Sequence, residues 1–301
     1  MKSGIINVYK EKGFTSFDVV AKLRGILKTK KIGHTGTLDP DAEGVLPVCI
    51  GRATKVCDLL TDKDKVYEAV LLLGVETDTQ DISGQVLEQL PVESSEEAVK
   101  EAIDSFVGEY AQVPPMYSAL KVNGKKLYEL AREGKTVERK ARRVQIYSID
   151  ILEINLPKIR ISVHCSKGTY IRTLCHDIGQ KLGCGGCMES LLRTKAGAFS
   201  LEGALKLSEI AELTDIRMVE EKIISVDELF EDYTKVWTKQ IFDVVVHNGN
   251  PIEERMLEEK LPVNTERLRV YDSEDAFIGI YEYFAERQNF KPVKMFYENN
   301  Q

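Results

Sequence analysis

The sequence predicts an α+β fold with a mixed, largely antiparallel sheet, and two observations lead to this class. Apolar residues alternate over 144–156 and 159–165, on either side of Pro157, as they do in a pair of antiparallel strands. Other strand candidates, such as 5–8, are followed by segments in which apolar residues keep helical spacing. Strands that are joined both by hairpins and by helices are typical of α+β proteins.

The N-terminal elements can be assigned in order. Residues 5–8 are expected to form a short strand, and Thr15 begins a helix with Asp18 at the capping-box position. The apolar residues of this helix keep helical spacing: Phe17, Val20, Leu23 and Leu27. Several glycines and a proline then interrupt all periodicity over 33–44, which predicts a loop before a strand over 45–50.

Five more elements follow before the composition changes. A strand is expected over 66–73 and a helix over 96–107. An Asn-Gly pair indicates a hairpin over 121–125, and helices are expected over 170–182 and 207–213. Together with the strand pair around Pro157, these elements complete one large α+β domain.

The C-terminal part differs in charge and pattern. Residues 201–301 carry 12 Lys and Arg against 22 Asp and Glu, so this part produces the formal net charge of −7. The stretch 236–283 reads as several short strands, and we place a domain boundary near 225–235. We therefore expect a large domain over 1–230 and a small β-rich domain over 231–301.

Two basic segments lie in the large domain. Residues 22–31 hold five basic residues and no acidic one, and residues 121–143 hold nine basic against three acidic. A solvated helix face explains one such segment as well as a phosphate-binding surface does. Two of them in one domain favour a polyanionic partner.

Composition also limits the compartment and the metal chemistry. The N-terminus lacks an apolar signal sequence, and no apolar run is long enough to span a membrane, so we expect a cytoplasmic protein. The six cysteines are irregularly spaced and are expected to be reduced thiols. Cys184 and Cys187 form a CxxC, but one such pair without a second is a weak zinc signal, so we expect no metal.

The loop over 33–44 is the most informative segment. Two glycines flank His34 and Thr35 and let the backbone approach a ligand closely, while Pro40 favours an extended conformation at Asp39. The segment lacks the Gly-Lys-Ser/Thr ending of a phosphate-binding P-loop. Glycine, aspartate and proline alone are more typical of a polar turn, so the choice between a turn and a presented carboxylate depends on the longer string.

That longer string resembles the catalytic motif of the TruB family of pseudouridine synthases: Gly33-His34-Thr35-Gly36-Thr37-Leu38-Asp39-Pro40, continuing to Lys55. Further segments resemble the family's other motifs in the family's order: 65–81, 114–134, 167–174 and 191–194. The resemblance implies a pseudouridine synthase fold for residues 1–230. It also implies a thumb-like RNA-contacting segment, about residues 112–145, and a PUA-like module over 231–301.

The resemblance implies isomerisation of uridine to pseudouridine in the T-loop of tRNA, at conventional position 55, with Asp39 as the catalytic carboxylate. Moving uracil from an N1 to a C5 glycosidic link is redox-neutral and requires no cofactor. It does require an ionised carboxylate, acting as nucleophile or as base. In a water-poor pocket this charge needs a cation close by, and the family pattern places Arg172 there.

Three further residues have roles that the resemblance implies. Tyr67 would stack on the flipped uracil and accept or relay its C5 proton, and Tyr170 would line the same pocket. By spacing alone, both tyrosines fit core or sheet positions better. His34 would insert into the T-loop at the place that the flipped bases leave, although a histidine satisfied within its own loop is the plainer interpretation.

The remaining implied residues concern the RNA. Asp81 would contact the RNA or order the site, Leu191 would pack against the uracil pocket, and Lys121 would contact the T-arm from the thumb-like segment. We expect a monomer that binds tRNA and no membrane, and the start of the chain at the catalytic motifs favours the stand-alone bacterial type. Two alternatives stay open: a non-catalytic RNA-binding or RNA-chaperone protein, and a synthase that acts on another RNA.

Overall fold

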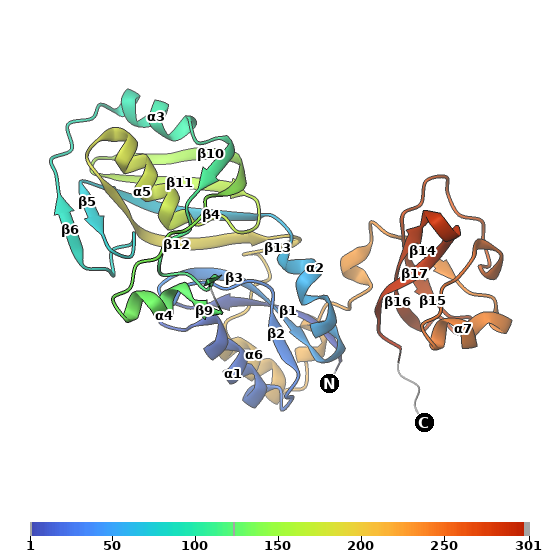
Figure 1. Ribbon diagram of the computed structural model, residues 1–301. Helices are drawn as coiled ribbons and strands as arrows, with labels where there is room; N and C mark the ends of the chain where they lie inside the picture. Colours follow the sequence, from blue (N-terminus) through green and yellow to red (C-terminus); the bar gives the residue numbers. More distant parts are fainter. Residues whose placement is uncertain (1, 123, 298–301) are drawn as a thin grey trace.

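The computed structural model describes residues 2–122 and 124–297, and two sheets dominate this part of the chain (Figure 1). The larger sheet contains nine strands in the path β1-β3-β12-β4-β11-β10-β7, with β13 beside β12 and β2 beside β3. Its pairings are antiparallel except for a short parallel contact between β12 and β3. The prediction of a mixed, largely antiparallel sheet is confirmed.

The strands of the large sheet have these bounds: β1 Gly4–Lys10, β2 Ile32–His34, β3 Glu43–Ile50, β4 Lys65–Leu73, β7 Gly108–Gln112, β10 Arg142–Asn155, β11 Lys158–Cys165, β12 Gly186–Ala196 and β13 Phe199–Ser200. Two small hairpins stand apart from it: β5 Val75–Thr77 with β6 Val86–Gln89, and β8 Lys121–Val122 with β9 Lys125–Lys126. The second hairpin agrees with the Asn-Gly prediction, although Asn123 itself lies outside the described residues.

Helices cover the large sheet in two groups (Figure 1). The α-helices are α1 Ser16–Ile26, α2 Cys57–Thr61, α3 Glu96–Asp104, α4 Leu127–Arg132, α5 Ile171–Leu182 and α6 Leu207–Asp215. Helices α1 and α6 bury their apolar residues against β1 and β3, whereas α3 and α5 bury theirs against β4, β10 and β11. The short 3₁₀ helices are η1 Gly51–Val56, η2 Val219–Lys222, η3 Glu228–Phe230, η4 Gln240–Phe242, η5 Glu254–Met256 and η6 Ala285–Arg287.

The first helix shows how the sequence sets an element boundary. The Thr15 side chain accepts from the Asp18 amide and the Asp18 carboxylate accepts from the Thr15 amide, which forms the predicted capping box. The assignment of Phe17 to the apolar face is wrong, because 64% of this residue is exposed. Val20, Leu23 and Leu27 are buried as predicted, and Val19 joins them in place of Phe17, which lies in the first turn on the outer side of the helix.

Two other predictions need correction. The expected loop begins later than residue 33, because β2 extends to His34 and pairs with β3. Strand β12, at the centre of the sheet, was not predicted. Its residues do not alternate cleanly, since register shifts near Met188 and Arg193 change which side chains face each side, and period-two spacing is lost.

The C-terminal module, which we define as residues 234–297, contains the second sheet, in the order β14-β15-β16-β17. Its elements are β14 Thr234–Trp237, α7 Asp243–His247, β15 Arg267–Tyr271, β16 Phe277–Phe284 and β17 Asn289–Met295. The prediction of short strands over 236–283 holds for β14 to β16. The prediction missed helix α7, because its run of three valines has high strand propensity. Tertiary contacts fix the helix instead, and Val246 is fully buried.

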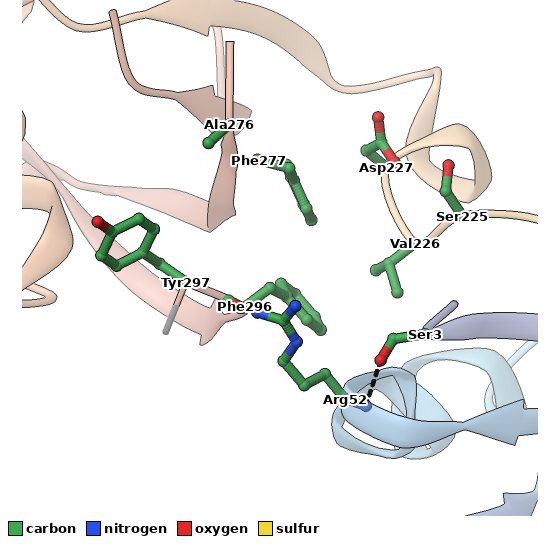
Figure 2. Close-up of a pocket in the computed structure, with 9 residues that line it drawn as sticks. All are labelled: Ser3, Arg52, Ser225, Val226, Asp227, Ala276, Phe277, Phe296 and Tyr297. Carbon is green, nitrogen blue, oxygen red and sulfur yellow. Dashed lines mark hydrogen bonds between the residues drawn. The ribbon is translucent and has the colours of Figure 1, made fainter. Parts of the chain in front are cut away.

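The module packs against the large sheet through an apolar cluster. Ile280 and Phe296 of the module lie in the same buried cluster as Ile5 of β1 and Val45 of β3. Lys294 also forms an ion pair of 2.7 Å with Asp58 on α2. A cavity of about 370 Å³ remains at this junction, and Figure 2 shows Arg52 on one side of it and residues of the module on the other.

Candidate active site

Asp39 lies on the connection between β2 and β3, and hydrogen bonds fix that connection on both sides of it. The Ser16 hydroxyl, at the start of α1, accepts from the Leu38 amide at 2.9 Å and donates to the Leu38 carbonyl at 3.3 Å. The ammonium group of Lys10, on β1, donates to the Pro40 carbonyl at 3.0 Å. Lys10 is fully buried and Ser16 nearly so, so both supports are rigid parts of the core.

The strand that follows the loop needs glycine at its second position. Gly44 has a φ of 105°, a conformation that residues with a Cβ rarely adopt. A Cβ at this position would lie 2.2 Å from the carbonyl oxygen of Arg193, its register partner on the parallel strand β12. Glycine therefore lets β12 approach the end of the loop that carries Asp39.

Arg172, in the first turn of α5, joins the two acidic residues of the site. Its Nε lies 3.1 Å from Asp39 Oδ2, and its Nη1 lies 3.3 Å from Asp81 Oδ2. The same guanidinium donates to the carbonyls of Thr79 at 3.2 Å and Tyr117 at 2.8 Å. Its side chain is only 7% exposed, so one buried cation holds together three segments that are far apart in the sequence.

Burial dominates the electrostatics of this cluster. Burial raises the pKa of Asp39 above its ordinary value, and the nearby Asp81 carboxylate raises it further. The positive charges of Arg172 and Lys10 oppose this rise and favour the ionised carboxylate. Lys10 is itself desolvated, which lowers its pKa to about 8. Even so, 43% of the Asp39 side chain is exposed, so a substrate can reach it.

Tyr67 approaches the site from β4, and its register partner on β12 is Arg193. The Arg193 side chain donates from Nε to the Val45 carbonyl at 2.7 Å and from Nη2 to the Gly36 carbonyl at 3.2 Å. Burial raises the pKa of Tyr67, and the charge of Arg193 acts in the opposite direction. Sequence reasoning did not assign Arg193 to the site. The available signal was a charged residue inside the motif at 191–194.

Two more of the predicted residues lie around the same cluster. Tyr170 immediately precedes α5, and the Gln112 side chain fixes it by accepting from its amide at 2.7 Å and donating to its carbonyl at 3.0 Å. Leu191 lies on β12 opposite Ala69 of β4. Leu191 and Tyr67 pack against the same apolar core and are themselves only partly buried.

His34 and Lys121 occupy different positions. His34 ends β2, and its Nδ1 accepts from the Gly36 amide at 3.4 Å. Burial and the charge of Arg193 both lower the pKa of His34, which favours the neutral imidazole. Lys121 is exposed on the β8–β9 hairpin. This hairpin is linked to the site through the chain itself, because Tyr117, four residues earlier, accepts from Arg172.

Three further findings concern disulfide bonds, metal binding and membrane-spanning helices. The six cysteines are free thiols, and Cys184 and Cys187 are buried. Among residues 2–122 and 124–297, no three His, Cys, Asp or Glu side chains are grouped as a metal would require. In the same residues, no helix is both long and apolar enough to cross a membrane.

Solved structures with the same architecture define the class of the protein. The chain aligns over 99% of its length with a chain of the archaeal box H/ACA sRNP Nop10-Cbf5 complex, covering 87% of that chain at 26% identity and a TM-score of 0.73. It aligns equally well, at 24% identity and a TM-score of 0.73, with a chain of an H/ACA RNP bound to a substrate RNA containing 2′-deoxyuridine, covering 99% of this chain and 86% of that one. The fold is that of the pseudouridine synthases.

Sequence comparison identifies the family within this class. Residues 24–171 match the model of the TruB family pseudouridylate synthase N-terminal domain, and residues 172–231 match the tRNA pseudouridylate synthase B C-terminal domain. The chain is 57% identical to tRNA pseudouridine synthase B of Lachnoclostridium phytofermentans, over 98% of this chain and 99% of that protein. It is 47% identical to the protein of the same name from Clostridium acetobutylicum, over 97% and 99%. The chain belongs to the TruB family of pseudouridine synthases.

Proposed function

We propose that this protein isomerises uridine to pseudouridine in the T-loop of tRNA, at conventional position 55, with Asp39 as the catalytic carboxylate. The observation that carries the proposal is the geometry of Asp39: a partly exposed carboxylate on a fixed loop, 3.1 Å from a buried guanidinium. The relatives named tRNA pseudouridine synthase B support tRNA as the substrate.

The isomerisation needs a carboxylate that is ionised near neutral pH. Arg172 supplies the charge that keeps Asp39 ionised against the effect of burial. Asp39 then acts as the nucleophile or the base that starts the detachment of uracil from the ribose. Asp81 holds the other side of the Arg172 guanidinium, so we assign it to ordering the site.

The residues around Asp39 suit a flipped base. Tyr67 and Tyr170 provide aromatic surfaces that compensate for lost stacking, and Leu191 provides an apolar wall beside Tyr67. We assign to Tyr67 the transfer of the C5 proton late in the reaction. His34, which has a lowered pKa, enters the space in the T-loop that the flipped base leaves.

The RNA is expected to bind across residues 1–230, which we propose as the catalytic domain. Phosphate contacts come from the basic segments 22–31 and 121–143, and Lys121 contacts the T-arm from the thumb-like segment 112–145. We propose that residues 231–301 form a PUA-like domain, whose acidic balance makes its share of the affinity small. The protein acts as a cytoplasmic monomer in this proposal.

The decisive experiment maps pseudouridine to the nucleotide in an unmodified tRNA transcript, without added cofactor. The parent protein should modify the T-loop uridine, and Asp39→Asn should form no product while it binds the tRNA within about tenfold of the parent, or about 1.4 kcal/mol. Product at another position, or in ribosomal RNA alone, would refute the assigned substrate. Tight binding with no product from the parent would leave an RNA-binding protein.

A further inference from the structure

Among the described residues, two buried arginines, Arg172 and Arg193, contact the segment that carries Asp39, and in this part of the chain only Arg172 pairs with carboxylates. Arg172 contacts the carboxylates of Asp39 and Asp81. Arg193 is 1% exposed, and within the described residues it makes no ion pair with a carboxylate. Its identified acceptors are two backbone carbonyls, at Gly36 and Val45.

A charge in this position is costly to the fold. An arginine taken out of water needs an anionic or strongly polar partner, and an apolar side chain of similar volume is often at least as stable. The surrounding groups increase the cost: burial lowers the pKa values of His34 on β2, Lys10 on β1 and Lys65 on β4, and the charge of Arg193 acts in the same direction on each of them. Packing alone therefore does not explain why a cation occupies this place.

Two features of the position connect Arg193 with the reaction. First, the Gly36 and Val45 carbonyls lie on either side of Asp39 in the sequence, so one guanidinium holds both ends of the catalytic loop against β12. Second, Arg193 is the register partner of Tyr67 on the neighbouring strand, and its charge acts on the Tyr67 hydroxyl. Arg193 thus contacts the segment that bears the carboxylate and lies beside the residue assigned to proton transfer.

We propose that Arg193 is a positioning residue of the isomerisation, which fixes the catalytic loop relative to Tyr67 and provides the cation beside the Tyr67 oxygen during transfer of the C5 proton. The inference rests on the proposed function. In this step the hydroxyl proton of Tyr67 moves to water ahead of the incoming proton, and the proton that leaves C5 binds to the Tyr67 oxygen. The electron pair of the broken C5–H bond forms the C5–C6 double bond of the uracil while N1 takes a proton from water, so no electrons are gained or lost. Partial negative charge on the Tyr67 oxygen during the exchange is stabilised by the guanidinium, which is already in place.

The test compares two substitutions that separate charge from hydrogen bonding. Arg193→Gln keeps a donor for a loop carbonyl and removes the charge, whereas Arg193→Lys keeps the charge and loses the planar fork. Single-turnover rates are measured with saturating tRNA, and tRNA affinity is measured separately. We expect Arg193→Gln to lower the rate about 100-fold and to leave affinity within about threefold, and Arg193→Lys to recover at least tenfold of that loss.

A double-mutant cycle with Tyr67→Phe tests the connection to Tyr67. If Arg193 acts through the Tyr67 hydroxyl, Arg193→Gln should cost clearly less in the Tyr67→Phe background than in the parent. Arg160→Gln serves as the control, because Arg160 is half exposed on β11 and pairs with Glu68 at 3.0 Å. The single-turnover rate of this variant should stay near that of the parent protein.

Three results would overturn the inference. The first is a folded Arg193→Gln protein that reacts at the parental rate. The second is an equal loss of rate in Arg193→Gln and Arg193→Lys that parallels a loss of stability in both variants. The third is a double-mutant cycle in which the rate losses of Arg193→Gln and Tyr67→Phe simply multiply. Inactivity of the parent protein on tRNA would instead refute the proposed function, so the two failures are distinguishable.

Discussion

The surroundings of Arg172 and Arg193 differ in how a buried positive charge is compensated. On the α5 side, Arg172 meets two carboxylates and two carbonyls, so its charge is balanced and its removal leaves acidic groups unpaired. On the β12 side, Arg193 meets carbonyls, a tyrosine and other cations. The comparison indicates that the ion pairs of Arg172 contribute more to stability than the contacts of Arg193, whose charge has no carboxylate beside it within the described residues.

Replacing Arg172 should produce the largest effect of this comparison. Arg172→Gln leaves Asp39 and Asp81 without their shared cation, and breaking a buried pair in this way costs about 3 kcal/mol of the free energy of unfolding. Turnover should also be lost, because Asp39 is then protonated more readily. Urea unfolding and single-turnover assays measure the two effects.

The matched variant for this prediction is Arg193→Gln. It should destabilise the protein less than Arg172→Gln, because no carboxylate loses its partner. If the Arg193 variant proved the less stable of the two, the distinction between a balanced and an unbalanced buried cation would be wrong.

The next-largest effect concerns the pH dependence of the rate, which follows the ionisation of Asp39 and should respond differently to substitutions of Arg172 and Arg193. The pKa of Asp39 lies above its ordinary value, so the folded protein binds the Asp39 proton more readily than the unfolded chain does. As pH falls through this pKa the active carboxylate is lost, and the rate should fall about tenfold per pH unit below an inflection that lies above 3.8. Stability changes in the opposite sense: the contribution of Asp39 decreases as pH rises through the same window.

Substitutions sharpen this prediction. Arg172→Lys should move the acid inflection to higher pH, because a lysine pairs less well with Asp39 and opposes the effect of burial less. Arg193→Lys should leave the inflection in place, since the charges that act most on Asp39 are those of Arg172, Asp81, Lys10 and Asp41. A shift of the same size in both variants would contradict the separate roles.

The smallest effect is expected at an exposed cation outside both clusters. Lys121 is solvent-exposed, so Lys121→Gln should leave the single-turnover rate at saturating tRNA unchanged. It should weaken tRNA binding less than tenfold and reduce the slope of log affinity against log salt by about one. Filter binding at several salt concentrations measures the slope, and Lys260→Gln, an exposed lysine of the acidic C-terminal module, should leave it unchanged.

Local sequence patterns were sufficient for elements whose boundaries depend on local chemistry. The capping box at Thr15 and Asp18 and the strand pair around Pro157 both occur where the sequence predicts them. Strand β12 and helix α7 could not be predicted in this way. The register of β12 depends on its neighbours on both sides, and the helical state of α7 depends on burial against the C-terminal sheet.

The sequence by itself determined the fold class and the family and predicted Asp39 as the catalytic carboxylate, because these follow from short-range patterns and from ordered motifs. Only the tertiary structure decided which charges meet. Arg172 is 133 residues from Asp39, and α5 and the loop come together only through the packed sheet. Arg193 is inconspicuous in its motif because its contacts with β3 and β4 form only when the strands pair in this order.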